Sequence, residues 1–195
     1  MIIGIDFDNT IIKYDNLFYK LCLEKKLIPK YLANQKNIIR DFLRDKNKEN
    51  EWTFIQGEVY GERIEEASAY PGMIDAITKL KSMDIPVKII SHKTKYPYKG
   101  PKRNLHEAAL KWMTKNNFFD GKLNFEEKDI FFESTKEQKV ERISSLGCTH
   151  YIDDLPEILE MIPSNIIRIN FSPSQKISNH NFKLMTKWSQ LLQII

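Results

Sequence analysis

The sequence predicts an α/β fold with a central parallel sheet and a small inserted α-helical segment. Three observations predict it: short apolar runs, several of them apolar at consecutive positions, helical apolar spacing between the runs, and one long stretch with only helical patterns. Apolar residues at consecutive positions are typical of strands buried on both faces of a parallel sheet. Strands that alternate with helices predict βαβ units, and therefore the α/β class.

The expected strands are short runs rich in β-branched or aromatic residues, at 2–7, 87–90, 130–132, 151–152 and 166–169. Apolar residues three or four positions apart predict helices over about 73–80, 105–113 and 140–146, and Gly147 supplies a stop for the third. A last helix is expected to carry Leu184, Trp188, Leu191 and Leu192.

Residues 14–69 break this alternation, because only helical patterns occur there. The three patterns begin near Leu17, Ile38 and Trp52, and Pro29 and the polar run 44–51 separate them. We therefore predict a catalytic core made of residues 1–13 and 70–195. Residues 14–69 form a helical cap, expected over the carboxyl edge of the sheet.

The composition is that of an ordinary globular protein. The chain has 195 residues, of which 42% are hydrophobic and 29% charged, so disordered and fibrous classes are excluded. No apolar run approaches the ~18 residues of a membrane span. Two cysteines are too few for a disulfide framework, and an acid at position 6 without a basic leader does not resemble a secretory signal. We expect a cytoplasmic protein with no membrane partner.

The net charge of +4 does not by itself predict a nucleic-acid partner. The 24 lysines are spread along the chain, whereas nucleic-acid binding needs clustered positive charge. The expected partner is a small molecule, and the oligomeric state stays open.

The chemistry is concentrated in the segment that follows the first expected strand, Asp6-Phe7-Asp8-Asn9-Thr10. Ligands of open α/β sheets bind beyond the carboxyl ends of the strands, which is where these carboxylates arrive. Alternation along an extended chain directs Asp6 and Asp8 to the same side. The alternative is a pair of acids that only caps a loop.

Two further strand ends carry polar residues. Ser91 ends the second expected strand, where its hydroxyl can donate to a phosphoryl oxygen. Asp153 and Asp154 follow a later strand, and acids so close to Asp6 and Asp8 need a cation to neutralise them. Oxygen ligands suit magnesium, so Asp153 is expected to be a ligand. Asp154 is either a second ligand or an N-cap for the next helix.

With these residues the chain resembles the haloacid dehalogenase-like (HAD) superfamily. The family's motifs are D-x-D-x-T after an apolar strand, an apolar run ending in Ser or Thr, a lysine, and an acidic pair. They are matched in order by residues 6–10, by Ser91, by a lysine near position 136, and by Asp153 with Asp154. The insertion at 14–69 lies where the family places a helical C1 cap, and the core would be Rossmann-like.

The resemblance implies a phosphatase mechanism. Asp6 would attack phosphorus and form an aspartyl-phosphate, and Asp8 would act as general acid and base. Magnesium would be bound by Asp6, the backbone carbonyl of Asp8, and Asp153. Thr10, Ser91 and a lysine would hold the phosphoryl oxygens. Two lysines are candidates for that role, Lys139 and, one turn earlier, Lys136.

The residues after Ser91 are expected to face the substrate. His92 and Lys93 begin a basic loop that runs to Arg103, and this loop either grips an anionic substrate or is simply solvated. The expected function is magnesium-dependent hydrolysis of a small phosphomonoester, a sugar phosphate or a nucleotide. Open alternatives are a phosphotransferase or mutase, a nucleic-acid end phosphatase, and a non-catalytic binding protein.

Overall fold

The computed structural model describes residues 1–174 and 182–195. The chain divides into two compact units. The sheet unit consists of Met1–Ile12, Ala69–Lys93 and Asn117–Ile195, and the helical unit of Lys13–Ser68 and Thr94–Asn116. Among the described helices, none has the length and apolar character that crossing a membrane requires.

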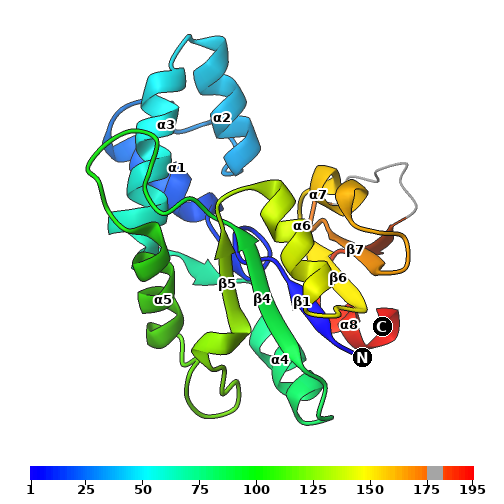
Figure 1. The fold of residues 1–195 in the computed structure, drawn as a ribbon. Helices are drawn as coiled ribbons and strands as arrows, with labels where there is room; N and C mark the ends of the chain where they lie inside the picture. The colour runs from blue at the N-terminus through cyan, green and yellow to red at the C-terminus, as the bar shows by residue number, and fades with distance from the viewer. Residues whose placement is uncertain (175–181) are drawn as a thin grey trace. The chain divides into compact units, whose positions relative to one another are not determined.

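The sheet unit contains a six-stranded parallel sheet (Figure 1), with strand order β5-β4-β1-β6-β7-β8. The strands are β1 (Ile3–Ile5), β4 (Val87–His92), β5 (Ile130–Glu133), β6 (His150–Asp153), β7 (Ile167–Phe171) and β8 (Lys183–Met185). The central strands β1 and β6 are buried along their whole length, as expected for the interior of a parallel sheet. The predicted α/β class with a parallel sheet is confirmed.

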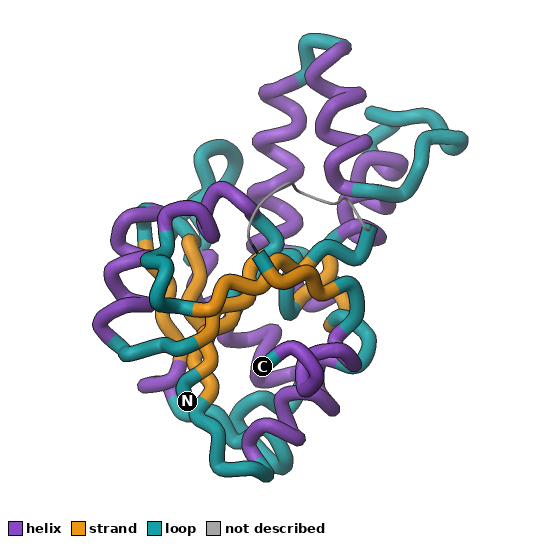
Figure 2. The backbone as a smooth tube through the Cα atoms, turned by 90° about the vertical axis from the view of Figure 1, so that its right-hand side faces the viewer, coloured by secondary structure: helices purple, strands orange, loops and turns teal. Residues whose placement is uncertain are grey.

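Helices lie on both sides of this sheet (Figure 2). They are α4 (Met73–Lys81), α6 (Lys136–Ser145), α7 (Pro156–Met161) and α8 (Leu191–Ile194), with 3-10 turns η3 (Glu127–Asp129) and η4 (Trp188–Gln190). Helices α6 and α7 bury Ile143 and Ile158 in one cluster with Ile90 of β4 and Tyr151 of β6. Gly147 ends the α6 segment at a φ of 67°, which confirms it as the predicted stop.

The predicted last helix is wrong at its start. Leu184 lies in strand β8, where it pairs with Asn170 of β7, and the helical structure begins only at Trp188. Leu184 is 41% exposed while the adjacent Met185 is buried, which is the alternation of an edge strand. The apolar spacing from Leu184 onward resembles that of a helix, but residues 183–185 form a strand because they pair with the edge of β7.

The helical unit is built around aromatic side chains. Its elements are α1 (Asp15–Glu24), α2 (Lys36–Asp45), α3 (Glu49–Gly57), the π-helical turn η1 (Glu58–Glu62), the 3-10 turn η2 (Ile64–Glu66) and α5 (Leu105–Lys115). Phe18 stacks on Trp52 with ring centroids 4.8 Å apart, and Tyr14 meets Tyr60 edge-on at 5.0 Å. The short strands β2 (Ile12–Lys13) and β3 (Ser68–Ala69) pair where the chain passes between the units.

The helical unit is larger than residues 14–69, because it also takes Thr94–Asn116, which the sequence analysis assigned to the core. The physical reason is the packing of α5. The indole N–H of Trp112 donates to the carbonyl oxygen of Ala67 at 2.8 Å, and Lys111 pairs with Glu65 at 2.6 Å. The basic loop before α5 packs on α3 so closely that a Cβ at Gly57 would lie 2.7 Å from the carbonyl oxygen of Lys99.

Candidate active site at the carboxyl end of the sheet

Asp6 stands directly beyond β1 and is buried. Its backbone N–H donates to the carbonyl oxygen of Ile152 at 2.9 Å, so the pairing of β1 with β6 continues through this residue. The chain then turns at Asn9, which has a φ of 60° and donates its N–H to the carbonyl oxygen of Ile12. Asparagine tolerates this left-handed conformation, and Asp8 lies between Asp6 and this turn.

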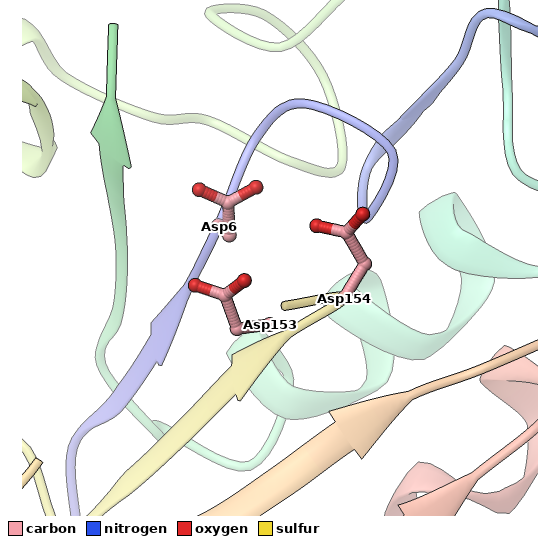
Figure 3. Close-up of side chains that lie close together, drawn as sticks. All are labelled: Asp6, Asp153 and Asp154. Atoms are coloured by element: carbon pink, nitrogen blue, oxygen red, sulfur yellow. The ribbon is translucent and has the colours of Figure 1, made fainter. Parts of the chain in front are cut away.

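A second pair of acids comes from the adjacent strand end. Carboxylate oxygens of Asp6, Asp153 and Asp154 all lie within 4.8 Å of one another (Figure 3). The Oδ1 of Asp153 accepts the N–H of Leu155 at 2.9 Å. Helix α7 has Leu155 at its N-cap position, and no side chain caps the helix from that position. The structure groups Asp154 with the other two acids.

Lys139 joins the two strand ends. Its Nζ donates to Oδ1 of Asp6 and to Oδ2 of Asp153, both at 2.6 Å, and the residue is only 1% exposed. Thr135 caps α6 by accepting the N–H of Gln138, which fixes the helix start and places Lys139 in the first full turn. Lys136, the other candidate, pairs with Glu157 at 2.8 Å instead. The geometry therefore brings Lys139, and not Lys136, to the acids.

Ser91 contacts the same aspartate from the other neighbouring strand. Its Oγ donates to Oδ1 of Asp6 at 2.9 Å. Among the described residues, the side-chain donors of Asp6 are Ser91 and Lys139, and both bind Oδ1. The second carboxylate oxygen, Oδ2, is therefore available for another partner.

The charges of this cluster are not balanced. The pKa of Asp6 is raised to about 7. Burial is the main cause, the nearby Lys139 opposes it, and the carboxylates of Asp153 and Asp8 act in the same direction as burial. Burial by itself would lower the pKa of Lys139, but Asp153 and Asp6 outweigh it and hold this pKa well above its ordinary value. Lys139 therefore stays charged, and one ammonium serves several carboxylates.

This excess of carboxylate oxygen suits a divalent cation. Asp6 and Asp153 already share the ammonium of Lys139, and Asp154 adds a further carboxylate within 4.8 Å. Hard oxygen donors are the ligands that magnesium prefers, and a cation of charge two would offset their mutual repulsion. The residues present therefore fit magnesium.

The remaining predicted residues have other hydrogen-bond partners than the Lys139 cluster. Lys93 donates to both carboxylate oxygens of Asp8, at 2.8 and 3.0 Å. His92 places Nε2 3.2 Å from the carbonyl oxygen of Ser134, and burial lowers the pKa of its imidazole. The hydroxyl of Thr10 is buried and has no hydrogen-bond partner among the described residues, while its carbonyl oxygen accepts the indole N–H of Trp188.

Two supporting residues escaped the sequence analysis. Asn170 is buried at the end of β7, and its amide donates to the carbonyl oxygens of Asp153 and Asp154 at 3.3 and 3.4 Å. Tyr151 lies with its ring centroid 5.5 Å from Nζ of Lys139. A Cβ at Gly4 would lie 2.6 Å from this ring, so glycine in β1 makes room for it. An amide at the end of an apolar strand was the signal available for Asn170.

No protein-family model and no curated protein matches the chain. Solved structures do match over its whole length. HAD-hydrolase YfnB from Bacillus subtilis, bound to magnesium, has a TM-score of 0.63 at 18% identity, covering 98% of this chain and 96% of that chain. A phosphoserine phosphohydrolase-like protein from Francisella tularensis has a TM-score of 0.61 at 12% identity, and the match covers 100% of this chain and 99% of that chain. A dehalogenase has a TM-score of 0.58 at 11% identity, and the match covers 100% of this chain and 96% of that chain.

The chain therefore has the fold of the HAD-superfamily hydrolases, as the motifs in the sequence predicted. Identities of 11 to 18% compare backbone architecture, so the reaction has to be argued from the side chains of this chain.

Proposed function

We propose that this protein is a magnesium-dependent phosphatase that hydrolyses a small phosphomonoester through an aspartyl-phosphate on Asp6. One observation carries the proposal. The buried ammonium of Lys139 lies 2.6 Å from both Asp6 and Asp153, and Ser91 donates to the same oxygen of Asp6. A nucleophile, a fixed positive charge and a hydroxyl donor thus converge beyond the carboxyl ends of β1, β4 and β6.

In this proposal each residue has one task. A carboxylate oxygen of Asp6 attacks phosphorus, the bond to the leaving oxygen breaks, and Asp8 gives that oxygen a proton. Water then attacks the aspartyl-phosphate and gives a proton to Asp8, which releases inorganic phosphate and restores Asp6. Lys139 and Ser91, with Thr10, stabilise the phosphoryl oxygens as charge shifts in the transition state.

Magnesium belongs to the same proposal. Asp6, Asp153 and the backbone carbonyl of Asp8 would hold the ion, with Asp154 as a further ligand. When bound, the ion supplies positive charge that offsets the repulsion between the carboxylates and a phosphate dianion. His92 is proposed to lie at the substrate's edge of the site, because it directly follows Ser91.

Asp8 favours a phosphatase over a dehalogenase, although dehalogenases are among the similar structures. A phosphate ester leaves as an alkoxide or phenoxide that needs a proton, whereas a halide leaves without one. A carboxylic acid two residues after the nucleophile is therefore useful only in the first reaction. A mutase or other phosphotransferase would use the same residues and pass the phosphoryl group to a second acceptor.

The test is a screen of sugar phosphates, nucleotides and p-nitrophenyl phosphate for release of inorganic phosphate. We expect turnover with magnesium and none with excess chelator. Chloride release from 2-chloropropionate in place of phosphate release would identify a dehalogenase. Phosphate transfer without release from the aryl ester would identify a mutase, and full activity in chelator would remove magnesium from the proposal.

A nucleic-acid end phosphatase is examined by the same assay. Oligonucleotides with terminal phosphates should be poor substrates. Activity on them that is high and falls steeply with added salt would contradict a small-molecule substrate, because phosphate-backbone binding is strongly salt-dependent.

A further inference from the structure

Lys93 and Asp8 form an ion pair that is separate from the Lys139 cluster. Nζ of Lys93 lies 2.8 Å from Oδ2 and 3.0 Å from Oδ1 of Asp8. The side chain of Lys93 is only 2% exposed, whereas that of Asp8 is 20% exposed. The lysine thus approaches from the protein interior and leaves part of the carboxylate open to solvent.

The backbone explains how a lysine reaches this position. Lys93 directly follows β4, and its N–H donates to the carbonyl oxygen of Glu133 at 2.8 Å, which extends the pairing of β4 with β5 by one residue. Its ammonium lies 5.6 Å from the centroid of the ring of Phe7, the residue that separates the two aspartates in the sequence. Strand pairing and ring packing therefore hold both ends of the lysine side chain.

A buried ammonium is unfavourable unless a carboxylate compensates it, and a lysine on the surface could pair with Asp8 without that cost. Contact with both oxygens of one carboxylate restricts the rotation of that carboxylate. The two aspartates of the D-x-D segment therefore have different cations, with Lys139 on Asp6 and Lys93 on Asp8.

We propose that Lys93 is a positioning residue that holds the Asp8 carboxylate for proton transfer to the leaving oxygen. The inference rests on the proposed phosphatase function and adds a role for a residue that the sequence placed against the substrate. A proton passes efficiently only when donor and acceptor oxygens lie within hydrogen-bond reach. Lys93 acts through Asp8 and takes no part in bond formation at phosphorus.

The experiment compares p-nitrophenyl phosphate with phenyl phosphate, because phenoxide is the poorer leaving group and needs the proton more. Wild type, Lys93→Met, Lys93→Arg and Asp8→Asn are assayed with magnesium, together with the double variant of Lys93→Met and Asp8→Asn. Lys88→Met is the matched control. Lys88 lies near the start of β4, at the end opposite Lys93, and it also pairs with an acid, Asp129.

We expect Lys93→Met to lower kcat for phenyl phosphate about tenfold more than for p-nitrophenyl phosphate, within the ~10²–10⁴-fold that a general acid contributes. KM should stay within about twofold, and Lys93→Arg should recover most of the loss. In the Asp8→Asn background, Lys93→Met should cause no further loss, because the residue it positions is gone.

Three results would overturn the inference. A rise in KM that is equal for both esters and persists in the Asp8→Asn background would mean that Lys93 binds the phosphoryl group directly. An equal loss of kcat for both esters, in step with a lower melting temperature, would mean a structural role only. Unchanged kinetics would remove any role.

Lys93→Gln, which keeps one donor, replaces Lys93→Met if the latter does not fold. The failure of the proposed function looks different from these outcomes, since wild-type protein would then release no phosphate from either ester.

Discussion

The sheet unit and the helical unit bury different kinds of side chain. All buried polar or charged side chains among the described residues lie in the sheet unit: Asp6, Thr10, Ser91, Lys93, Lys139, His150, Asp153 and Asn170. The helical unit buries apolar and aromatic groups, and its ion pairs, such as Arg63 with Glu24, are solvent-accessible. Apart from His150, which begins β6 at the opposite end of the sheet, these side chains gather near the carboxyl ends of the strands. Buried charge is costly unless it is paired, so this grouping supports the carboxyl edge as the candidate site.

The extent of the helical unit determines which residues a deletion variant that lacks this unit must omit. Deleting residues 14–69 alone would take away Ala67, whose carbonyl oxygen accepts the indole N–H of Trp112. Helix α5 would then expose the face that buries Trp112 and Met113. A deletion that tests whether this unit selects the substrate therefore has to include residues 94–116.

The largest effect is expected for Asp6, the proposed nucleophile. Asp6→Asn should lower phosphate release by about four orders of magnitude or more, because an amide oxygen cannot form the aspartyl-phosphate. The matched variant Asp45→Asn changes an exposed acid of the helical unit and should leave turnover unchanged. Retention of a tenth of the wild-type rate by Asp6→Asn would contradict the assignment.

The second prediction compares ion pairs of the two units. Lys139→Met leaves Asp6 and Asp153 buried without their cation, which should lower the free energy of unfolding by about 3–5 kcal/mol at pH 8. Arg63→Met removes accessible pairs in the helical unit and should cost at most about 1 kcal/mol. Urea denaturation in chelator measures the free energy of unfolding of both variants. Equal losses would contradict the view that buried and accessible ion pairs contribute differently in the two units.

The third prediction concerns pH. Because burial raises the pKa of Asp6 from 3.8 to about 7, the folded chain holds a proton in this window that the unfolded chain releases. The free energy of unfolding contributed by Asp6 therefore falls as pH rises from 3.8 to about 7. In chelator, the stability of Asp6→Asn relative to wild type should therefore rise by about 4 kcal/mol across this window, since one pKa unit corresponds to about 1.4 kcal/mol.

Magnesium should reduce that difference, because the ion favours the ionised carboxylate and binds only the folded state. A difference between wild type and Asp6→Asn that does not change with pH, with or without magnesium, would contradict the raised pKa.

The smallest effects come from two matched indole hydrogen bonds. Trp112 donates to Ala67 in the helical unit, and Trp188 donates to Thr10 in the sheet unit at 3.1 Å. Each Trp→Phe variant should lose about 1 kcal/mol of stability in thermal or urea unfolding. Only Trp188→Phe should also lower turnover, since it loosens the segment that carries Asp6 and Asp8. Equal turnover in both variants would show that Thr10 needs no such support.

Local sequence was sufficient for the strands and for the order of the polar residues that follow them. Short, mainly apolar runs located β1, β4, β5, β6 and β7, and the D-x-D-x-T segment, Ser91 and the acidic pair stand at strand ends as predicted. These features depend on periodicity and on the geometry of parallel sheets, both of which are properties of neighbouring residues.

The choice between Lys136 and Lys139 needed the tertiary structure. Both lysines stand in the first turns of α6, and helical spacing alone does not say which one turns inward. The packing of α6 over Tyr151 directs Lys139 to Asp6, while Lys136 meets Glu157.

The sequence by itself determined the parallel sheet, the acids at its carboxyl edge and the helical character of the insertion, because each follows from spacing along the chain. Only the tertiary structure decided that Leu184 joins an edge strand, that residues 94–116 belong with the helical unit, and that Lys93 pairs with Asp8. These outcomes depend on which distant surfaces and charges meet, and contacts between residues 85 positions apart leave no periodic signal in the sequence.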